Sequence, residues 1–379
     1  MDFDLSQEQA MIRKLAREFA DEVVAPGAGA RDKSGEFPVD LVKQLGDLGL
    51  LGIPYAEEYG GMGGDTVSYA LAVEELSRAD ASLGITVAAH CSIGMGPVYY
   101  FGTEEQKQRW LPAAARGESL ASFGLTEPGA GSDSAGTKTT AVAQGDAWVL
   151  NGSKQYITNA YYCGYIVCTA VTDPSKGHKG ISAFIVPNPT EGFSVGPGYD
   201  KMGLHASDTR PLYFDNVRIP RENLLGNPGE GFKQFMITLD GGRISIGAMA
   251  VGIAQASLDA ALKYAKEREQ FGQSIAKFQA IQFKLADMAM EVELARTMVL
   301  KAAWLKDQGR PFTREGAMAK LFASEAAVRA ANQAIQIHGG AGYMEDFPVS
   351  RYWRDAKLTE IGEGTSEIQR IVIAKQLGC

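Results

Sequence analysis

The chain is 379 residues long, 45% hydrophobic and 22% charged, which is enough for two or three soluble domains with a substantial core. Its formal net charge is −8 and no run of lysines or arginines stands out, which excludes the basic surface that nucleic-acid binding requires. Its four cysteines show neither CxxC spacing nor a metal-ligand pattern with the four histidines, so we expect reduced thiols in a cytoplasmic protein and no metal site.

The first part of the chain, residues 1–118, predicts a helical domain. Acidic residues interrupt the apolar stretch Met1–Ala20, which also lacks a basic start, so we expect no signal peptide. Apolar residues recur at helical spacing in three runs, of which Pro26 ends the first and a glycine-rich turn separates the last two. The predicted helices are Glu8–Val24, Pro38–Leu48 and Asp65–Ala79.

Residues 119–231 predict a β domain. Short runs rich in β-branched and aromatic residues alternate with Gly, Pro, Asn and Asp, which is typical of strands and turns. No long helix lies between the runs, which excludes the alternating strands and helices of a Rossmann fold. The predicted strands lie in Ser122–Leu125, Lys138–Ala143, Ala147–Asn151, Tyr165–Val171, Ser182–Val186 and Leu212–Val217.

Residues 232–379 return to helical spacing. Apolar residues recur every three or four positions from Ile281 to Ala302, the pattern of a helix in an antiparallel bundle. Ser245–Arg268 and Arg314–Ile337 predict two further long helices. The weakly polar run Ile244–Leu258 is too short and too polar to span a bilayer, so we expect no membrane segment. The predicted fold class is α+β, in the order helical domain, β domain, helical bundle.

Three glycine-rich segments are candidates for ligand binding: Thr126–Asp133, Gln336–Gly342 and Ile361–Gln369. None has the spacing of a familiar phosphate-binding loop. In the third, Ser366 and Gln369 are spaced as a capping box, which predicts a helix beginning just after Ser366 and places Glu363 in the loop before it.

Glu363 is the candidate catalytic residue. Its neighbours Gly362 and Gly364 let a ligand approach the backbone on either side of the carboxylate. Substrate that shields this carboxylate from water would raise its pKa and make it a base near neutral pH. From this segment alone, the alternative is an exposed loop glutamate.

Five segments, TEPGAGSD, KQYITNA, REQFG, QIHGGAGY and EGTSEIQR, make the whole chain resemble the acyl-CoA dehydrogenase family, most closely its short-chain (butyryl-type) members. The resemblance implies an N-terminal helical domain, a central β domain and a C-terminal four-helix bundle. It also implies FAD as cofactor, an acyl-CoA substrate, electron-transfer flavoprotein as electron acceptor, and a homotetramer built as a dimer of dimers.

The resemblance assigns binding roles residue by residue. Tyr156 stands where the family usually has Trp, so the aromatic surface beside the flavin is smaller. The residues implied around the flavin ring are Phe123, Leu125, Thr126, Gly131, Ser132, Tyr156, Ile157 and Thr158. Those implied for the ADP half of FAD, across a subunit interface, are Arg268, Phe271, Gln279, Gln336, Ile337, His338, Gly339, Gly340, Thr365, Ser366 and Glu367. Those implied for the acyl-CoA are Ser132, Asp240, Arg243 and Gly364.

The same resemblance implies the reaction. Glu363 takes the α-proton, flavin N5 takes the β-hydride, and the product is a trans-2-enoyl-CoA. The Glu363 N–H and a flavin hydroxyl polarise the thioester carbonyl. Short-chain relatives usually carry Tyr at the position of Gly362 and often a large residue at that of Gly94. We therefore expect an acyl pocket that tolerates branching.

Two alternative functions share the fold. An acyl-CoA oxidase passes its electrons to oxygen, but such oxidases generally carry a C-terminal extension beyond the position of Cys379. A flavin-binding relative without dehydrogenase activity, such as a DNA-binding alkylation-response protein, is disfavoured by the acidic charge and the intact Glu363 segment. His338, His90 and His205 have structural roles as their simpler interpretation, and we expect the methionines at 288, 290 and 298 to pack in the core.

Overall fold

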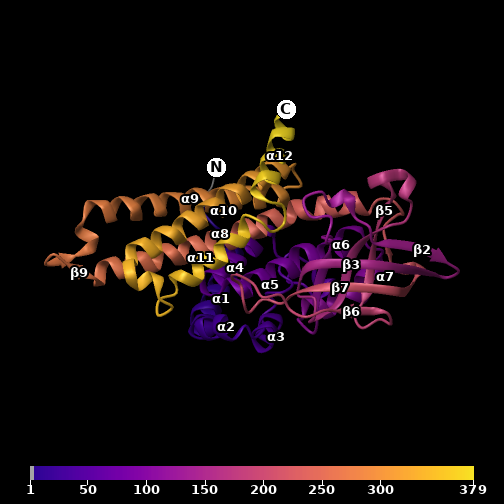
Figure 1. Cartoon of the computed structure of the whole chain (residues 1–379), viewed down its shortest axis with the longest axis horizontal. Coiled ribbons are helices and arrows are strands. Elements are labelled where there is room, and N and C mark those ends of the chain that lie inside the picture. The colour runs from indigo at the N-terminus through magenta and orange to yellow at the C-terminus, as the bar shows by residue number, and fades with distance from the viewer. Residues whose placement is uncertain (1–3) are drawn as a thin grey trace.

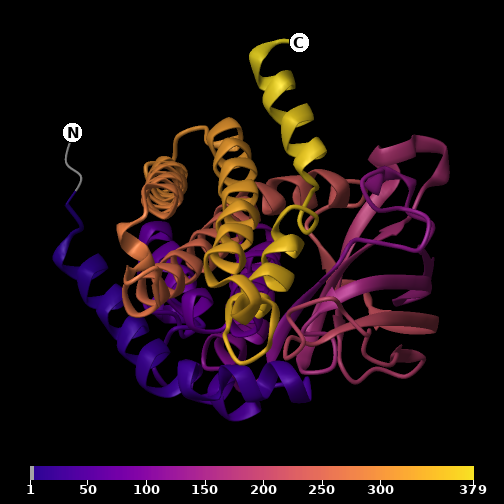
Figure 2. The same ribbon diagram turned by 60° about the vertical axis from the view of Figure 1, so that its left-hand side comes forward.

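The computed structural model describes residues 4–379, so the first three residues of the stretch Met1–Ala20 lie outside it. Helices from the first part of the chain pack against long helices from the last part, and the sheet forms one end of the molecule (Figure 1). In the turned view, the last helix, α12 (Ser366–Leu377), projects away from the others (Figure 2). The predicted fold class is confirmed.

Capping side chains set where the N-terminal helices begin. Ser6 Oγ accepts a hydrogen bond from the Gln9 N–H at 3.1 Å and Gln9 returns one, which forms a capping box. The first predicted helix continues beyond Phe19 as a π-helical turn, η1 (Ala20–Val24), and a second π-helical segment, η4 (Ala89–Met95), follows α5. The helices are α1 (Gln7–Phe19), α2 (Ala28–Ser34), α3 (Val39–Asp47), α4 (Thr66–Ala79), α5 (Ala81–Ala88), α6 (Gly96–Phe101) and α7 (Glu104–Ala115).

The β domain is one sheet in the order β6-β7-β3-β2-β4-β5-β8, with β1 paired in parallel to β4. Every predicted run falls on a strand, but β3 and β7 extend further because they pair with each other along most of their length. Strands β6 and β8 were not predicted, since two or three residues are too few to show alternation. The strands are β1 (Leu120–Gly124), β2 (Thr140–Gln144), β3 (Ala147–Thr158), β4 (Cys163–Val171), β5 (Ile181–Pro187), β6 (Phe193–Val195), β7 (Thr209–Pro220) and β8 (Leu224–Leu225).

The C-terminal helices form the expected bundle, in which α8, α9, α10 and α11 pack together. The apolar seam predicted on α9 is buried from Met288 to Ala302, but Met290 is 56% exposed, so its predicted core position is wrong. Helix α8 begins at Gly231 and not at Ser245, because packing of buried residues keeps Gly241 and Gly242 helical despite their low propensity. The elements are α8 (Gly231–Glu267), β9 (Glu269–Gln270), β10 (Gln273–Ser274), α9 (Gln279–Asp307), α10 (Thr313–His338), α11 (Val349–Thr359) and α12 (Ser366–Leu377).

Two helical stretches, Ala81–Phe101 and Gly231–Glu267, are long and apolar enough to cross a membrane by length and composition alone. Most of each stretch is buried inside the protein, as is usual for core helices of soluble proteins, so they are weak indications of a membrane span. Helix α8 is thus longer than the apolar run that the sequence suggested.

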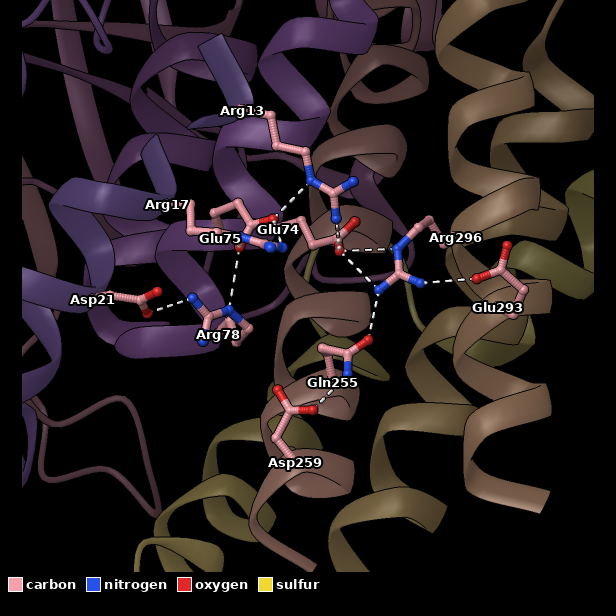
Figure 3. Close-up of polar contacts among 10 residues, drawn as sticks. All are labelled: Arg13, Arg17, Asp21, Glu74, Glu75, Arg78, Gln255, Asp259, Glu293 and Arg296. Atoms are coloured by element: carbon pink, nitrogen blue, oxygen red, sulfur yellow. Dashed lines mark hydrogen bonds and ion pairs between the residues drawn. The ribbon is translucent and has the colours of Figure 1, made fainter. Parts of the chain in front are cut away.

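Buried ion pairs join the N-terminal helices to the bundle (Figure 3). Glu74 Oε1 accepts from Arg296 of α9 at 3.0 Å, and Arg296 also donates to Gln255 of α8 at 2.8 Å. The adjacent Glu75 is paired with three arginines of α1 and α4: Arg13, Arg17 and Arg78. Burial raises the pKa of Glu74. Burial alone would also raise the pKa of Glu75, but its arginine partners outweigh this and lower it. These contacts fix α4 against α8 and α9.

Candidate active site

Glu363 lies in the short loop between α11 and α12. The Ser366 N–H donates to Glu360 O at 2.9 Å and closes this loop. The predicted capping box is wrong by one residue: Thr365 is the N-cap, and its Oγ1 accepts from the Ile368 N–H at 3.3 Å. The Gln369 side chain is buried and donates to Gly364 O at 2.9 Å, so it supports the loop and does not cap the helix.

Glu363 is half-buried and one oxygen of its carboxylate is shielded from water, so it is not a fully exposed loop glutamate. Its Oε2 is inaccessible and has no hydrogen-bond partner among residues 4–379. It lies against Gly242 of α8, where a methyl group would overlap Oε2 and also approach Ile93 of η4 to 3.1 Å. Burial raises the pKa of Glu363 to about 7, although Lys320 and Arg243 pull it down.

The backbone at Glu363 is also unusual. Its φ of 53° lies in the left-handed region, which a residue with a side chain rarely adopts. Within residues 4–379 its N–H donates no hydrogen bond to the chain. The carboxylate and the adjacent N–H are therefore both left for a ligand, as a polarising donor for a carbonyl oxygen requires.

Asp240 is the other carboxylate that the sequence placed near this site, but it is fully engaged. It accepts from Arg243 Nη1 at 2.5 Å and from Thr313 Oγ1 of α10 at 2.6 Å. Arg243 is buried, and its Nε has no partner among the described residues. Asp240 is thus tied to its own helix and to α10, whereas Glu363 has an unpartnered oxygen.

The segments predicted around the flavin lie together in the β domain. Thr126 O accepts from the Gln155 N–H at 2.9 Å, which joins the loop after β1 to strand β3. Ser132 and Gly131 are exposed on the same loop. Tyr156 is 61% exposed and has a φ of 60°, an uncommon backbone conformation for an aromatic residue. This edge of the sheet presents an exposed ring and an open loop to a ligand.

The segments predicted around the ADP half lie elsewhere. Arg268 and Phe271 belong to the β9–β10 hairpin, which is at the opposite end of the molecule from the sheet (Figure 1). Phe271 is 93% exposed, and Gly339 and Gly340 at the end of α10 have open space around them. Thr365, Ser366 and Glu367, which were predicted with them, lie at the start of α12 beside Glu363. One chain therefore does not bring the hairpin and the end of α10 together with the predicted flavin segments.

The histidines have structural contacts. His338 stacks on Tyr264 with ring centroids 4.2 Å apart, and its Nδ1 lies 2.7 Å from Ala334 O. His90 is buried and its Nδ1 accepts from the Ala121 N–H at 2.9 Å. His205 contacts backbone oxygens through both ring nitrogens.

Sequence reasoning missed three features of this region. Lys320 on α10 is wholly buried and its Nζ donates to Gly364 O at 2.7 Å. Gly242 makes the space that the Glu363 carboxylate occupies. The third is a buried ion pair between Lys154 and Glu127, 2.7 Å apart, beneath the predicted flavin loop. Of these, only Lys320 could have been noticed in the sequence. It stands among the alanines of α10, and a charged residue on a packed helix face is rare.

Gly94 shows no spare volume. A methyl group there would lie 2.6 Å from Ala121 O, so Gly94 is required for close packing of η4 on β1, and the expectation that it opens the acyl pocket is wrong. Gly362 differs, because the nearest atoms to a methyl group there belong to Leu358 at 3.6–3.8 Å.

The chain thus combines a helical domain, a sheet and a helical bundle with a loop carboxylate, Glu363, whose pKa is raised and whose Oε2 is unpartnered within residues 4–379, which is the arrangement of an enzyme with a general base. The chain matches the acyl-CoA dehydrogenase N-terminal domain over residues 6–118, the middle domain over 122–217 and the C-terminal domain over 229–378. It therefore belongs to the acyl-CoA dehydrogenase family and is an oxidoreductase of that kind. The family depends on FAD, which confirms the expected cofactor.

Individual relatives agree with this assignment. A probable acyl-CoA dehydrogenase of Bacillus subtilis is 62% identical over 378 residues, with all of both chains covered. The structure of butyryl-CoA dehydrogenase from Megasphaera elsdenii is 47% identical, with a TM-score of 0.98 and all of both chains covered. A chain in the structure of the electron transferring flavoprotein of Acidaminococcus fermentans is 51% identical, with a TM-score of 0.99, covering 100% of this chain and 99% of that one.

Proposed function

We propose that this acyl-CoA dehydrogenase acts on short acyl-CoA thioesters, with Glu363 as the base that removes the α-proton. The observation that carries the proposal is the unpartnered Oε2 of Glu363, which is shielded from water and has its pKa raised to about 7. Such a carboxylate is partly ionised at neutral pH and holds a captured proton more readily than an exposed one. The butyryl-type relative supports a short acyl chain.

The residues present fit FAD. The exposed ring of Tyr156 and the open loop carrying Ser132 offer a surface for the flavin ring. The exposed Phe271 and the uncrowded Gly339 and Gly340 offer one for the ADP half. Ser366 Oγ, at the start of α12 and three residues after Glu363, is buried without a partner within residues 4–379. An exposed aromatic ring and an unsatisfied buried hydroxyl are both features that a bound ligand would satisfy.

The mechanism uses the two free groups of Glu363. Its N–H donates to the thioester oxygen, which draws electron density from the carbonyl and makes the α-hydrogen acidic. Its carboxylate then takes that proton, while Gly242 keeps the space around the carboxylate clear. The chemistry that FAD supplies when bound is acceptance of a hydride from the β-carbon. Loss of one proton and one hydride leaves a carbon–carbon double bond.

Anaerobic mixing with butyryl-CoA tests this function directly. We expect the flavin absorbance to bleach and crotonyl-CoA to form in equal amount. A flavin-binding relative without dehydrogenase activity would show no bleaching. An acyl-CoA oxidase would bleach but would then turn over rapidly with oxygen alone. Turnover that needs electron-transfer flavoprotein would support that protein as the acceptor, in line with the solved structure that contains a similar chain.

The active enzyme is an oligomer in which two chains complete each FAD site, and we propose a dimer of dimers. The β9–β10 hairpin, next to Arg268, lies at the opposite end of the molecule from the sheet that carries the predicted flavin segments (Figure 1). Helix α9 exposes an apolar face with Phe283 and Leu294, and the projecting α12 exposes Ile371 and Leu377. Such faces are typical of surfaces that a second chain covers.

Arg268→Ala should lose FAD and oligomer together, because Arg268 directly precedes the β9–β10 hairpin, which lies at the opposite end of the molecule from the sheet of its own chain. Size-exclusion mass and the flavin-to-protein absorbance ratio measure both. Arg116→Ala, which removes an exposed arginine paired with Glu118, is the matched control and should change neither. A monomer replete with FAD would contradict the shared site.

The acyl pocket should accept branched substrates because Gly362 carries no side chain, and a methyl group there would meet Leu358 only at ordinary contact distances of 3.6–3.8 Å. We expect 2-methyl-branched or isovaleryl-CoA to be used within about tenfold of butyryl-CoA, a difference of ~1.4 kcal/mol. Gly362→Tyr should reduce kcat/KM for the branched substrate more than for the straight one, because the added ring fills that space. Ile361→Tyr, at an exposed neighbour, is the control. An equal reduction for both substrates would reject Gly362 as a determinant of specificity.

A further inference from the structure

We propose that Lys320 is the positioning residue of the base: its ammonium group holds the loop through Gly364 and provides the counter-charge of the Glu363 carboxylate. This inference rests on the function proposed above. Lys320 lies on the face of α10 that packs against α8. Its backbone is so close to Gly247 of α8 that a methyl group added to Gly247 would lie 3.7 Å from the Lys320 Cα and N atoms. Its side chain is wholly buried, and its Nζ donates to Gly364 O at 2.7 Å.

A buried ammonium group requires more than one carbonyl. Moving such an ion out of water costs several kcal/mol, and an uncharged side chain of similar length would fill the same space without that cost. An ammonium has three N–H donors, of which the Gly364 carbonyl takes one. A carboxylate close by is therefore needed to stabilise the charge.

The charged groups around Lys320 identify that carboxylate. Glu360 is already paired with Lys357 at 2.5 Å, and Glu367 is exposed. Of the cations facing Glu363, Arg243 is balanced by Asp240 at 2.5 Å. Tyr69 of α4 also faces Glu363 from the N-terminal helices, and burial keeps that phenol uncharged by raising its pKa. Lys320 and Glu363 are left to balance each other.

The hydrogen bond to Gly364 has a second consequence. Glu363 and Gly364 both have positive φ, of 53° and 93°, so the loop is held in an uncommon conformation. Lys320 and Gln369 both donate to the Gly364 carbonyl and together keep it turned inward. Holding Gly364 in this way also restrains the preceding residue, Glu363, whose side chain and N–H are the groups that face substrate.

The test compares two variants that separate charge from hydrogen bonding. Lys320→Gln removes the charge and keeps a donor, whereas Lys320→Met removes both. For wild type we expect kcat/KM for butyryl-CoA to fall on the acid side of its pH profile with a midpoint near pH 7. This acid limb reports the pKa of the base in the free enzyme. Burial lowers the pKa of Lys320 to about 8, so its charge persists through this limb.

In both variants the limb should move up by about one pH unit, because losing a nearby cation disfavours the carboxylate form. Above the limb, the Gln variant should stay within about threefold of wild type, and the Met variant should fall below it because Gly364 is released. Lys14→Gln removes an exposed lysine of α1 that pairs with Glu18, and should leave the limb in place.

A limb that moves by less than about 0.3 unit in an FAD-replete Lys320→Gln variant overturns the proposal, even if activity falls at all pH values. If Lys320→Met does not fold, the Gln variant decides alone. Turnover by Glu363→Gln would overturn the base and this proposal together. If Glu363→Gln is inactive but the acid limb of Lys320→Gln does not move, only the role of Lys320 is overturned.

Discussion

Glu363→Gln should retain FAD and the native fold but lose dehydrogenation by about 10⁴-fold or more. The amide has almost the same shape as the carboxylate, so the contact with Gly242 and the loop conformation survive. It cannot accept the α-proton, and Asp240, the other carboxylate that the sequence placed near the site, is held by Arg243 and Thr313. Anaerobic stopped-flow absorbance with butyryl-CoA measures the rate of flavin bleaching.

Glu360→Gln is the matched control, because this carboxylate lies three residues away in the same loop and pairs with Lys357. It should keep activity within about threefold, as expected for the loss of an exposed ion pair. A Glu363→Gln variant with a tenth or more of wild-type turnover would show that another group is the base. A variant that loses FAD would leave the rate uninformative, so the flavin content is measured in the same preparation.

The order of domains could be predicted from the sequence because the helical and β regions differ in apolar spacing and composition. The α9 seam alternates in steps of three and four. The second half of β7 alternates between buried and exposed residues, whereas β1, β4 and β5 are buried almost throughout and are recognisable by their β-branched and aromatic residues between turns. The start of α8 could not be predicted in this way. Gly241 and Gly242 are poor helix formers, and it is their close packing against Ile93 and Glu363 that keeps this turn helical.

Glu363 could be predicted because its local sequence is informative: two glycines flank one carboxylate before a helix. The start of that helix was misplaced because Thr365 and Ser366 are both good N-caps, and only backbone geometry decides between them. Lys320 and Gly242 act on Glu363 from other helices. Their roles depend on tertiary contacts between residues 43 or more positions apart, which local pattern does not contain.

The Lys154–Glu127 pair shows how the sheet supports the flavin loop. Lys154 on β3 is wholly buried, and its Nζ bonds Glu127 at 2.7 Å and Thr169 of β4 at 3.3 Å. Glu127, in the loop after β1, also accepts from the Lys138 N–H at 2.6 Å. Burial alone would raise the pKa of Glu127, but Lys154 and the neighbouring donors lower it to about 2. The pair joins the loop that carries Thr126 to two strands.

Lys154→Met should therefore destabilise the protein by about 3–5 kcal/mol, because it leaves the Glu127 carboxylate buried without its cation. The double variant Lys154→Met/Glu127→Gln should recover most of this loss, since neither charge remains. Urea unfolding followed by circular dichroism measures both, and the flavin content of each variant reports whether the loop still binds FAD.

Wild type gains stability from Glu127 above its unfolded pKa of about 4.3 and loses it as the pH falls toward 2. The single variant should show the opposite slope, gaining stability between pH 7 and 5 as the unpaired Glu127 takes up a proton. A double variant as unstable as the single one would mean that Lys154 acts through packing alone, and the charge pair would have no part in holding the loop.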